Sequence, residues 1–325
     1  MLTLSALLSL CACSGKETEA LQVDPILPGQ ESVEPVRSTF SIRFLDVGQG
    51  DSALVECDGH YMLIDGGEVS AGEKVYSVLA QQGVRKLDIL AVSHLHTDHY
   101  GGLISGLNDR PEIGMTISNA TQTDTATFER FQQVLQSLGT QITVPAAGDR
   151  YALGSATVEV IDSCAEEGND SLVLMVTYGK TRFLFTGDIE RSGQLRVVEY
   201  FENARIDPSD WVSLIKMPHH GAYNDNSGLS ENALYRLFWE YDPSYFVISV
   251  GADNQYGHPH RETVKLIEDM VVRAKELDWD GHVYRTDERG DVVVRSDGET
   301  LSFGAAQEYN ENEGRVPIKD ISEPR

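Results

Sequence analysis

The sequence is short of basic residues. Over 325 residues it carries 26 Lys and Arg against 51 Asp and Glu, a net charge of −25. A body this acidic repels polyanions at long range, which counts against a protein that reads DNA sequence through a basic surface. It does not count against an enzyme for phosphate esters, because metal ions can draw such a substrate in.

The apolar run at the N-terminus, residues 1–13 (MLTLSALLSLCAC), is too short to cross a bilayer as a helix, which needs roughly 20 residues. It has the length of a signal-peptide core. The ending LCAC resembles a bacterial lipobox with Cys13 as the lipid-bearing residue, although no Lys or Arg precedes the run. We therefore predict an exported lipoprotein that only a lipid anchor holds at the bacterial cell surface, with a buried N-terminal helix as the alternative.

Cysteine is scarce as well. Of four cysteines, Cys11 and Cys13 belong to the apolar run, which leaves Cys57 and Cys164. No CxxC or Cys–His spacing indicates a cysteine-ligated metal. The two remaining residues could pair in an oxidising compartment, but we favour two buried free thiols. The aromatic residues form no regularly spaced ladder, so aromatic content alone does not predict binding of a strand of bases.

The chain divides into four segments by composition. Residues 14–39 contain Pro25, Pro28 and Pro35 among Glu and Ser and read as a disordered linker. Residues 40–304 hold the periodic apolar patterns of one folded domain, and residues 305–325 read as a disordered acidic tail. Within the domain no short repeat occurs.

Helix and strand patterns within residues 40–304 predict a four-layer fold. Strands are expected at residues 40–45, 52–57, 60–65, 87–93, 141–146, 156–162, 171–178, 182–188, 211–217 and 244–250, with a last hairpin over 282–296. Helices are expected at 73–83, 128–139, 194–204, 230–241 and 262–276. Each half starts with mostly antiparallel strands and continues with helix–strand alternation. This order favours an α/β (α+β) architecture of two packed sheets with helices outside, an αββα sandwich.

One loop concentrates imidazole and carboxylate: residues 93–102 read SHLHTDHYGG. A buried strand delivers the chain to His94, and side chains two apart in extended backbone point the same way, so His94 and His96 can bind one metal ion together. Asp98 and His99 follow closely enough to serve a second ion. Gly101 and Gly102 allow a close backbone approach. This donor set suits Zn²⁺, Mn²⁺ or Fe.

The pattern HxHxDH followed by two glycines resembles the signature of the metallo-β-lactamase superfamily. In that resemblance Asp65 of IDGG orients a ligand, Asp188 of FLFTGD bridges two metal ions, and His219 of KMPHHG is the last ligand. Further motifs narrow the resemblance to the hydrolase domain of the ComEC competence proteins. They are FLDVGQGDSALVE, NDSLVLMVTYGKTRFLFTGDIE, KMPHHGAYNDNS, SVGADNQYGHPH and YRTDERGDVVV. The similarity covers residues 40 to about 304 and does not include the membrane channel of those proteins.

One position departs from the superfamily pattern. Many members place a third histidine ahead of the bridging aspartate, but here that region reads EEGNDSL, with no histidine between His99 and His219. Asn169 or Asp170 stands in its place, and Asn169 would be a weak ligand that suits Mn²⁺ better than Zn²⁺. We therefore expect two divalent ions, Zn or Mn, with the first one weakly held.

The resemblance implies hydrolysis by a metal-activated hydroxide with in-line attack on a phosphodiester. Asp98 is counted with the catalytic residues as well as the ligands. His220 and His258 are the candidates to protonate the leaving group; the alternatives are a hydrogen bond to a ligand for His220 and a rigid pocket wall for His258. Gln49 and Asp51 of DVGQGDS either support the metal centre or cap backbone amides in a turn.

The leading hypothesis is a metal-dependent phosphodiesterase that cleaves DNA, with single-stranded DNA as the candidate substrate and no protein partner expected. An esterase for an envelope polymer, of teichoic-acid or phosphorylcholine type, is the first alternative. Hydrolysis of amides, thioesters or β-lactams is disfavoured by the missing third histidine, and a di-iron redox role lacks a flavin domain. A non-catalytic binding module is least expected, because six ligand-type residues are retained: His94, His96, Asp98, His99, Asp188 and His219.

Overall fold

The computed structural model describes residues 39–108, 111–166, 169–204, 212–224, 232–241, 243–276 and 282–305. Residues 1–37 and 38–325 separate into two units, and every described residue belongs to the second. The predicted signal peptide with Cys13, and all but the edges of the predicted linker and tail, lie outside the described residues. Within the described ranges, no helix combines the length and the apolar character that crossing a membrane requires.

The first sheet has eight strands, antiparallel on one side and parallel on the other. In spatial order they are β15 (Leu301–Ala305), β14 (Val292–Ser296), β1 (Phe40–Phe44), β2 (Ala53–Cys57), β3 (His60–Ile64), β4 (Lys86–Val92), β5 (Glu112–Ser118) and β6 (Ile142–Thr143). Pairing is antiparallel from β15 to β3 and parallel from β3 to β6. The predicted turn between β2 and β3 is confirmed: Asp58 and Gly59 both have positive φ, which suits a tight hairpin.

The second sheet has seven strands on the same plan. In spatial order they are β13 (His282–Arg285), β12 (Tyr245–Ile248), β11 (Leu214–Lys216), β10 (Thr181–Phe185), β9 (Val173–Tyr178), β8 (Ala156–Asp162) and β7 (Arg150–Leu153). The strands from β7 to β10 pair antiparallel, and those from β10 to β13 pair parallel. Both halves therefore start with antiparallel strands and add parallel ones, as predicted.

The predicted hairpin over residues 282–296 is wrong. Strand β13 pairs parallel with β12 in the second sheet, whereas β14 pairs antiparallel with β1 and β15 in the first. The short helix α8 (Thr286–Arg289) carries the chain from one sheet to the other, anchored where the Thr286 hydroxyl donates to the carbonyl of Val250 and accepts from its amide. Two apolar segments that lie close together in the sequence suggest a hairpin. Here each of them pairs with a strand of a different sheet instead of with the other segment.

Two other strand predictions also need correction. The strand expected at residues 141–146 contracts to β6, and β5, β7 and β15 were not predicted at all. These three strands lie at or near a sheet edge, where only part of the side chains is buried, so their apolar patterns are weak.

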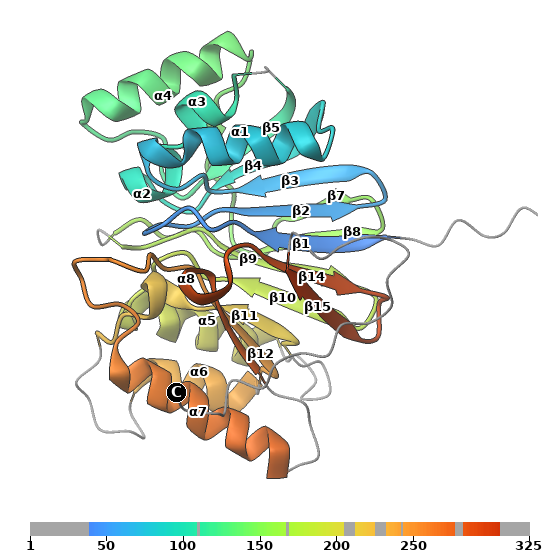
Figure 1. Ribbon diagram of the computed structural model, residues 1–325, viewed down its shortest axis with the longest axis vertical. Helices are drawn as coiled ribbons and strands as arrows, with labels where there is room; N and C mark the ends of the chain where they lie inside the picture. The colour runs from blue at the N-terminus through green and yellow to red at the C-terminus, as the bar shows by residue number, and fades with distance from the viewer. Residues whose placement is uncertain are drawn as a thin grey trace, which may run out of the picture. The chain divides into compact units, whose positions relative to one another are not determined.

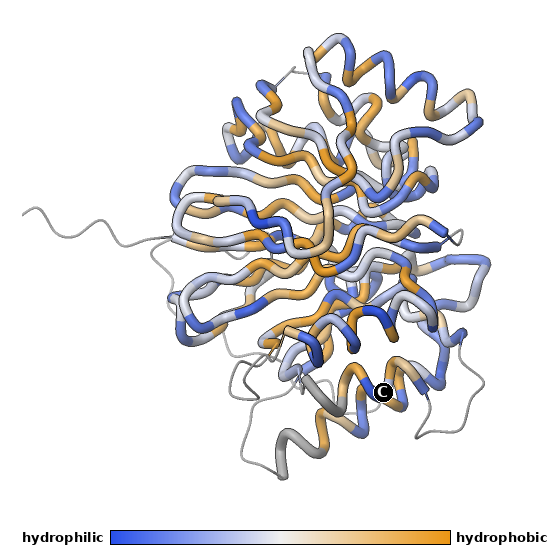
Figure 2. The backbone as a smooth tube through the Cα atoms, turned by 180° about the vertical axis from the view of Figure 1, so that it is seen from behind, coloured by the Kyte–Doolittle hydropathy of each residue, from blue (hydrophilic) through white to orange (hydrophobic). Residues whose placement is uncertain are grey.

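Helices cover the outer face of each sheet, which confirms the αββα sandwich (Figure 1). The 3₁₀ turn η1 (Val69–Ala71) and helices α1 (Gly72–Gln81), α2 (Thr97–Tyr100), α3 (Leu103–Gly106) and α4 (Ala126–Ser137) accompany the first sheet. The 3₁₀ turn η2 (Pro218–Gly221) and helices α5 (Arg191–Ala204), α6 (Ala233–Tyr241) and α7 (Arg261–Glu276) accompany the second. Apolar residues gather along the strands, while the helices alternate between polar and apolar segments (Figure 2).

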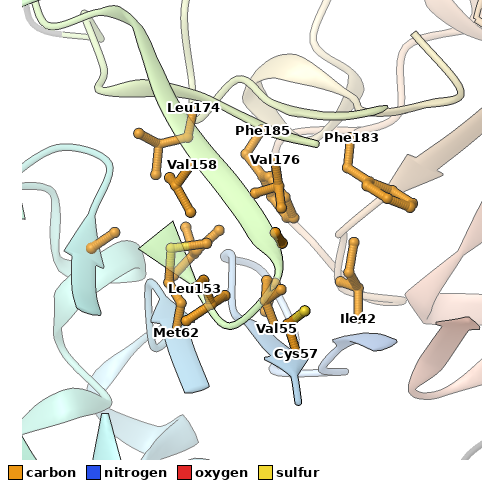
Figure 3. Packing of buried hydrophobic residues seen from close by; sticks show 14 of the residues in the cluster. Ile42, Val55, Cys57, Met62, Leu153, Val158, Leu174, Val176, Phe183 and Phe185 are labelled. Atoms are coloured by element: carbon orange, nitrogen blue, oxygen red, sulfur yellow. The ribbon is translucent and has the colours of Figure 1, made fainter. Parts of the chain in front are cut away.

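The central core lies between the two sheets. Leu174 and Val176 of β9 face Val55 and Met62 of the first sheet (Figure 3). The ring of Phe183 stacks on that of Phe40, with centroids 4.9 Å apart. The structure holds Cys57 and Cys164 as free thiols, and only Cys57 is buried. This core fixes the distance between the sheets, and with it the distance between the loops that leave each sheet.

Truncation of Val176 tests this core. Its side chain is fully buried, so Val176→Ala removes two methyl groups and leaves a cavity, and we expect a loss of about 1–3 kcal/mol in the free energy of unfolding. Val144→Ala is the matched control because Val144 is 48% exposed and lies outside the core. Urea denaturation measures both. Equal effects from the two substitutions would contradict the assigned core.

Candidate metal centre

Strands of both sheets end at one edge, and the candidate site residues lie there. Asp65 follows β3 and His94 follows β4, and these two strands are parallel neighbours. In the second sheet, Asp188 follows β10 and His220 follows β11, again parallel neighbours. The carboxyl ends of parallel strands are the usual place of sites in such sheets, because side chains on the following loops converge there.

Four of these side chains form a tight cluster. Asp98, His99, Asp188 and His220 each offer one ligand atom, and these atoms all lie within 4.8 Å of one another. His99 Nε2 is 3.2 Å from Asp188 Oδ2, and His220 Nε2 is 3.5 Å from the same oxygen and 3.4 Å from Asp98 Oδ2. All but Asp98 are buried. The cluster joins α2 of the first half to the loops after β10 and β11.

The ligand atoms of this cluster fit a divalent metal ion. His99 Nε2, His220 Nε2 and Asp188 Oδ1 are buried and make no hydrogen bond with any residue in the described ranges. Unpaired buried polar atoms are rare and costly, and a cation bound between the two imidazoles and the Asp188 carboxylate would give both Nε2 atoms a partner. Two imidazoles and two carboxylates form a donor set that suits Zn²⁺, Mn²⁺ or Fe²⁺.

Hydrogen bonds behind the cluster set the direction of both imidazoles. His99 Nδ1 lies 2.9 Å from Asp65 Oδ2, while Asp65 Oδ1 accepts a bond of 2.7 Å from the backbone amide of Ser93. His220 Nδ1 donates to the carbonyl of Ser249 at 2.9 Å. Each ring therefore turns Nε2 toward the cluster, as ligand histidines do. This geometry agrees with the orienting role expected for Asp65.

The structure places His220, and not His219, in the cluster, which reverses the sequence expectation. Both residues adopt left-handed backbone angles, with φ of 48° and 53°, so adjacent rings diverge by 66°. His219 Nε2 lies 3.8 Å from Asp188 Oδ2, and its Nδ1 faces Glu190 Oε1 at 3.4 Å. Non-glycine residues in this region are strained by about 1–2 kcal/mol each, and such strain is concentrated at functional sites.

His94 and His96 lie beside the cluster rather than in it. His94 Nε2 is 2.9 Å from His96 Nδ1, so the two nitrogens can approach one ion from the same side, as the spacing predicts. The ring of His94 lies 4.2 Å from that of His99. His94 is buried, whereas His96 is exposed. The pair offers two ligands for a second ion next to the first.

The structure does not bring Asn169 into the cluster. Its amide Nδ2 donates to Glu190 Oε1 at 2.7 Å, and Glu190 also faces His219. The neighbouring Asp170 is buried and forms an ion pair with Arg196, which anchors the loop before β9. The weak-ligand role expected for Asn169 therefore has no geometric support.

Sequence reasoning missed Lys216, the last residue of β11. Its side chain is buried, contacts the carboxylate of Asp51, donates to the carbonyl of Gly187 at 3.1 Å and lies 3.9 Å from Asp188 Oδ1. Asp51 Oδ1 in turn lies 3.3 Å from His220 Nδ1. Lys216 lies within residues 211–217, which the sequence analysis predicted as a strand without a functional residue. Its position at the carboxyl end of an otherwise apolar strand could have identified it as a site residue.

The cluster shifts the pKa values of its members strongly. Burial raises the pKa of Asp188, but His99 and His220 outweigh it, and the pKa lies well below the usual range. Burial lowers the pKa of His220, but Asp188 and Asp51 raise it to about 10. The carboxylates of this edge are thus stabilised by positive charge, which a divalent ion can supply when the imidazoles give up their protons to ligate it.

The loop from β12 to α7 forms one wall of the site. Gln49 Oε1 accepts from the amide of Gly251 at 3.3 Å, and Gln49 Nε2 lies 3.5 Å from His258 Nδ1. Burial and the neighbouring His219 and His220 lower the pKa of His258 to about 4. His258 is therefore neutral at pH 7, which does not support the expected role of proton donor. It fits a hydrogen-bonding wall residue better.

A family model described as "Metallo-beta-lactamase superfamily" matches residues 45–225, more than half of the chain and every residue of the cluster. The chain belongs to the metallo-β-lactamase superfamily. Members of this superfamily are metal-dependent hydrolases, and the cluster of Asp98, His99, Asp188 and His220 is the position in this member that can bind a divalent metal ion.

The predicted resemblance to competence proteins is confirmed. The chain is similar to ComE operon protein 3 of Bacillus subtilis, with 25% identity over 84% of this chain and 35% of that protein. It is also similar to competence protein ComA of Neisseria gonorrhoeae, with 26% identity over 73% of this chain and 30% of that protein. The chain thus spans about a third of the length of these relatives.

A solved structure is similar in fold. The metallo-β-lactamase fold protein YhfI of Bacillus subtilis matches with a TM-score of 0.47 and 14% identity, over 79% of this chain and all of that protein.

Metal titration distinguishes the two neighbouring histidines. We expect His220→Gln to weaken binding of Mn²⁺ or Zn²⁺ by more than 100-fold, because a ligand is lost, and His219→Gln to weaken it by about 10–100-fold at most, the range for residues that only support a ligand. Isothermal titration calorimetry measures the affinity. His60→Gln is the control, since His60 lies on β3 with a half-exposed side chain. A larger effect from His219→Gln would restore the original expectation.

The buried pair of Lys216 and Asp51 gives a second prediction. Lys216→Met leaves the Asp51 carboxylate uncompensated, and we expect the free energy of unfolding of the metal-free protein to fall by about 3–5 kcal/mol. Lys216→Met combined with Asp51→Asn should recover part of this loss in urea denaturation. Lys180→Met, which breaks an ion pair with Glu299 at the surface, serves as control and should change little. Additive effects of the two buried substitutions would argue against the pair.

Proposed function

We propose that this chain is a metal-dependent phosphodiesterase that cleaves single-stranded DNA. The observation that carries the proposal is the cluster of Asp98, His99, Asp188 and His220, whose ligand atoms lie within 4.8 Å of one another and whose two imidazole Nε2 atoms are buried without a hydrogen-bond partner among the described residues. Two divalent ions, Mn or Zn, are proposed here, the second held by His94 and His96. When bound, such ions supply an activated water and positive charge against the phosphoryl oxygens.

The residues around the cluster would keep this arrangement rigid during the reaction. Asp65 holds His99 in place, and the Ser249 carbonyl holds His220. Asp188 lies within 4 Å of His99, His219 and His220, and its carboxylate would help to hold both ions. His258 is neutral at pH 7 and is placed on the loop wall to donate a hydrogen bond to a phosphate oxygen. Such preorganised groups contribute because they need not reorient in the transition state.

DNA is the proposed substrate because the relatives named above are competence proteins. The net charge of −25 makes the metal ions the only strong attraction for a polyanion, so weak binding that depends on metal is expected. The same acidity, with the proposed lipid anchor at Cys13, also suits a phosphodiester polymer of the cell envelope. That polymer is the alternative substrate.

The proposal is tested by activity with two substrates. Wild-type protein loaded with Mn²⁺ or Zn²⁺ should hydrolyse bis-p-nitrophenyl phosphate and a single-stranded oligonucleotide. Asp188→Ala should lower both rates at least about 100-fold while circular dichroism shows an intact fold. Asp269→Ala, an exposed position on α7, is the matched control and should retain full activity.

Three outcomes would contradict parts of the proposal. Hydrolysis of the small diester with the oligonucleotide left intact would reject the nuclease and favour the envelope polymer. Full activity of Asp188→Ala would reject the cluster as the catalytic centre. Elemental analysis that finds no transition metal in the purified wild type, and no activity after metal is added, would favour a non-catalytic binding module.

A further inference from the structure

The rings of Tyr256 and His258, on the loop between β12 and α7, form a row with the ring of His220 in the metal cluster. Tyr256 is 58% exposed, the largest exposed fraction among the large apolar side chains of the described residues. Its ring stacks on His258, with centroids 5.6 Å apart and planes inclined by 25°. The ring of His258 lies 6.3 Å from that of His220, inclined by 28°. The outermost ring is therefore aligned with a residue of the metal cluster.

Hydrogen bonds hold this loop in one shape. Asn254 Oδ1 accepts from the amides of Tyr256 at 3.2 Å and His258 at 2.9 Å. Its Nδ2 donates to the carbonyls of Gly251 at 2.8 Å and His258 at 2.7 Å. Gln49, on the loop between β1 and β2, accepts a hydrogen bond from the amide of Gly251 through its Oε1. The Tyr256 ring is thus preorganised, so a ligand that contacts it need not order the loop first.

The charge of the protein limits how a DNA strand could be held near the metals. With a net charge of −25, the protein has little electrostatic attraction for phosphates beyond the metal ions themselves. Proteins that bind single strands without sequence preference also use aromatic rings, because every base has a face that can stack. An exposed tyrosine that is separated from His220 of the cluster by one ring, that of His258, can supply this contribution, and it does not depend on charge.

We infer that Tyr256, backed by His258, is a stacking platform for a nucleobase that flanks the phosphodiester bound at the metal centre. This inference rests on the proposed nuclease function. A base can stack on Tyr256 only if it is unpaired and not stacked on its neighbours. The inference therefore predicts that the protein cleaves single strands in preference to duplexes. It also assigns the YGHP stretch to substrate binding rather than to chemistry.

The test compares two oligomers that differ only in their bases. Oligothymidylate and an abasic phosphodiester oligomer of equal length and charge are cleaved by wild type, Tyr256→Ala and Tyr256→Phe in the presence of Mn²⁺. We expect Tyr256→Ala to raise KM for oligothymidylate about ten- to a hundredfold with little change in kcat, and to leave the abasic oligomer unaffected. Tyr256→Phe should behave as wild type. Tyr76→Ala, an exposed position on α1, is the matched control.

Each contrary result has a separate meaning. An equal loss on both oligomers with Tyr256→Ala would show a structural role of the loop and overturn the platform. Wild-type protein that cleaves the abasic oligomer as well as or better than oligothymidylate would overturn it too, and would point to a polymer without bases. If neither oligomer is cleaved while bis-p-nitrophenyl phosphate is hydrolysed, the nuclease function itself fails, and the platform with it.

Discussion

The whole site depends on carboxylates that are buried together and need positive charge nearby. Asp51 and Asp188 are almost completely enclosed, and Asp98 is partly so. The ammonium group of Lys216 pairs with the carboxylate of Asp51, and the imidazoles of His99 and His220 face the carboxylate of Asp188. The Nε2 atoms of His99 and His220 have no hydrogen-bond partner among the described residues, and both face Asp188 Oδ2. A divalent ion between these groups would complete the charge balance of this edge.

The charged side chains come together because the two sheets have the same arrangement of strands. Each sheet adds parallel strands to antiparallel ones, and the carboxyl ends of the parallel strands meet where the sheets pack. Close backbone contacts draw the loops together. A Cβ at Gly102 would overlap the carbonyl oxygen of Gly66, and one at Gly50 would overlap that of Asp98. Glycine at these two positions therefore lets the metal-binding loop lie directly on its neighbours.

Substrate recognition follows from the contrast between this centre and the rest of the protein. The net charge of −25 repels phosphates, whereas a metal-loaded centre would attract them, so on the proposed function a phosphodiester would bind at the metal centre. Contacts around that centre are rigid: left-handed backbone angles at His219 and His220, and the hydrogen bonds of Asn254. On the proposed function, selectivity would come from neutral contacts such as stacking and hydrogen bonds rather than from a basic groove.

The sequence by itself determined the αββα sandwich, the superfamily and the approximate set of site residues, because alternating apolar patterns and the HLHTDH motif are local features. Only the tertiary structure decided which of His219 and His220 enters the cluster, since adjacent residues differ only by the backbone angles of a strained turn. It also revealed Lys216, removed Asn169 from the candidate ligands and separated β13 from β14. These last three points depend on contacts between segments far apart in the chain, and a local pattern does not contain them.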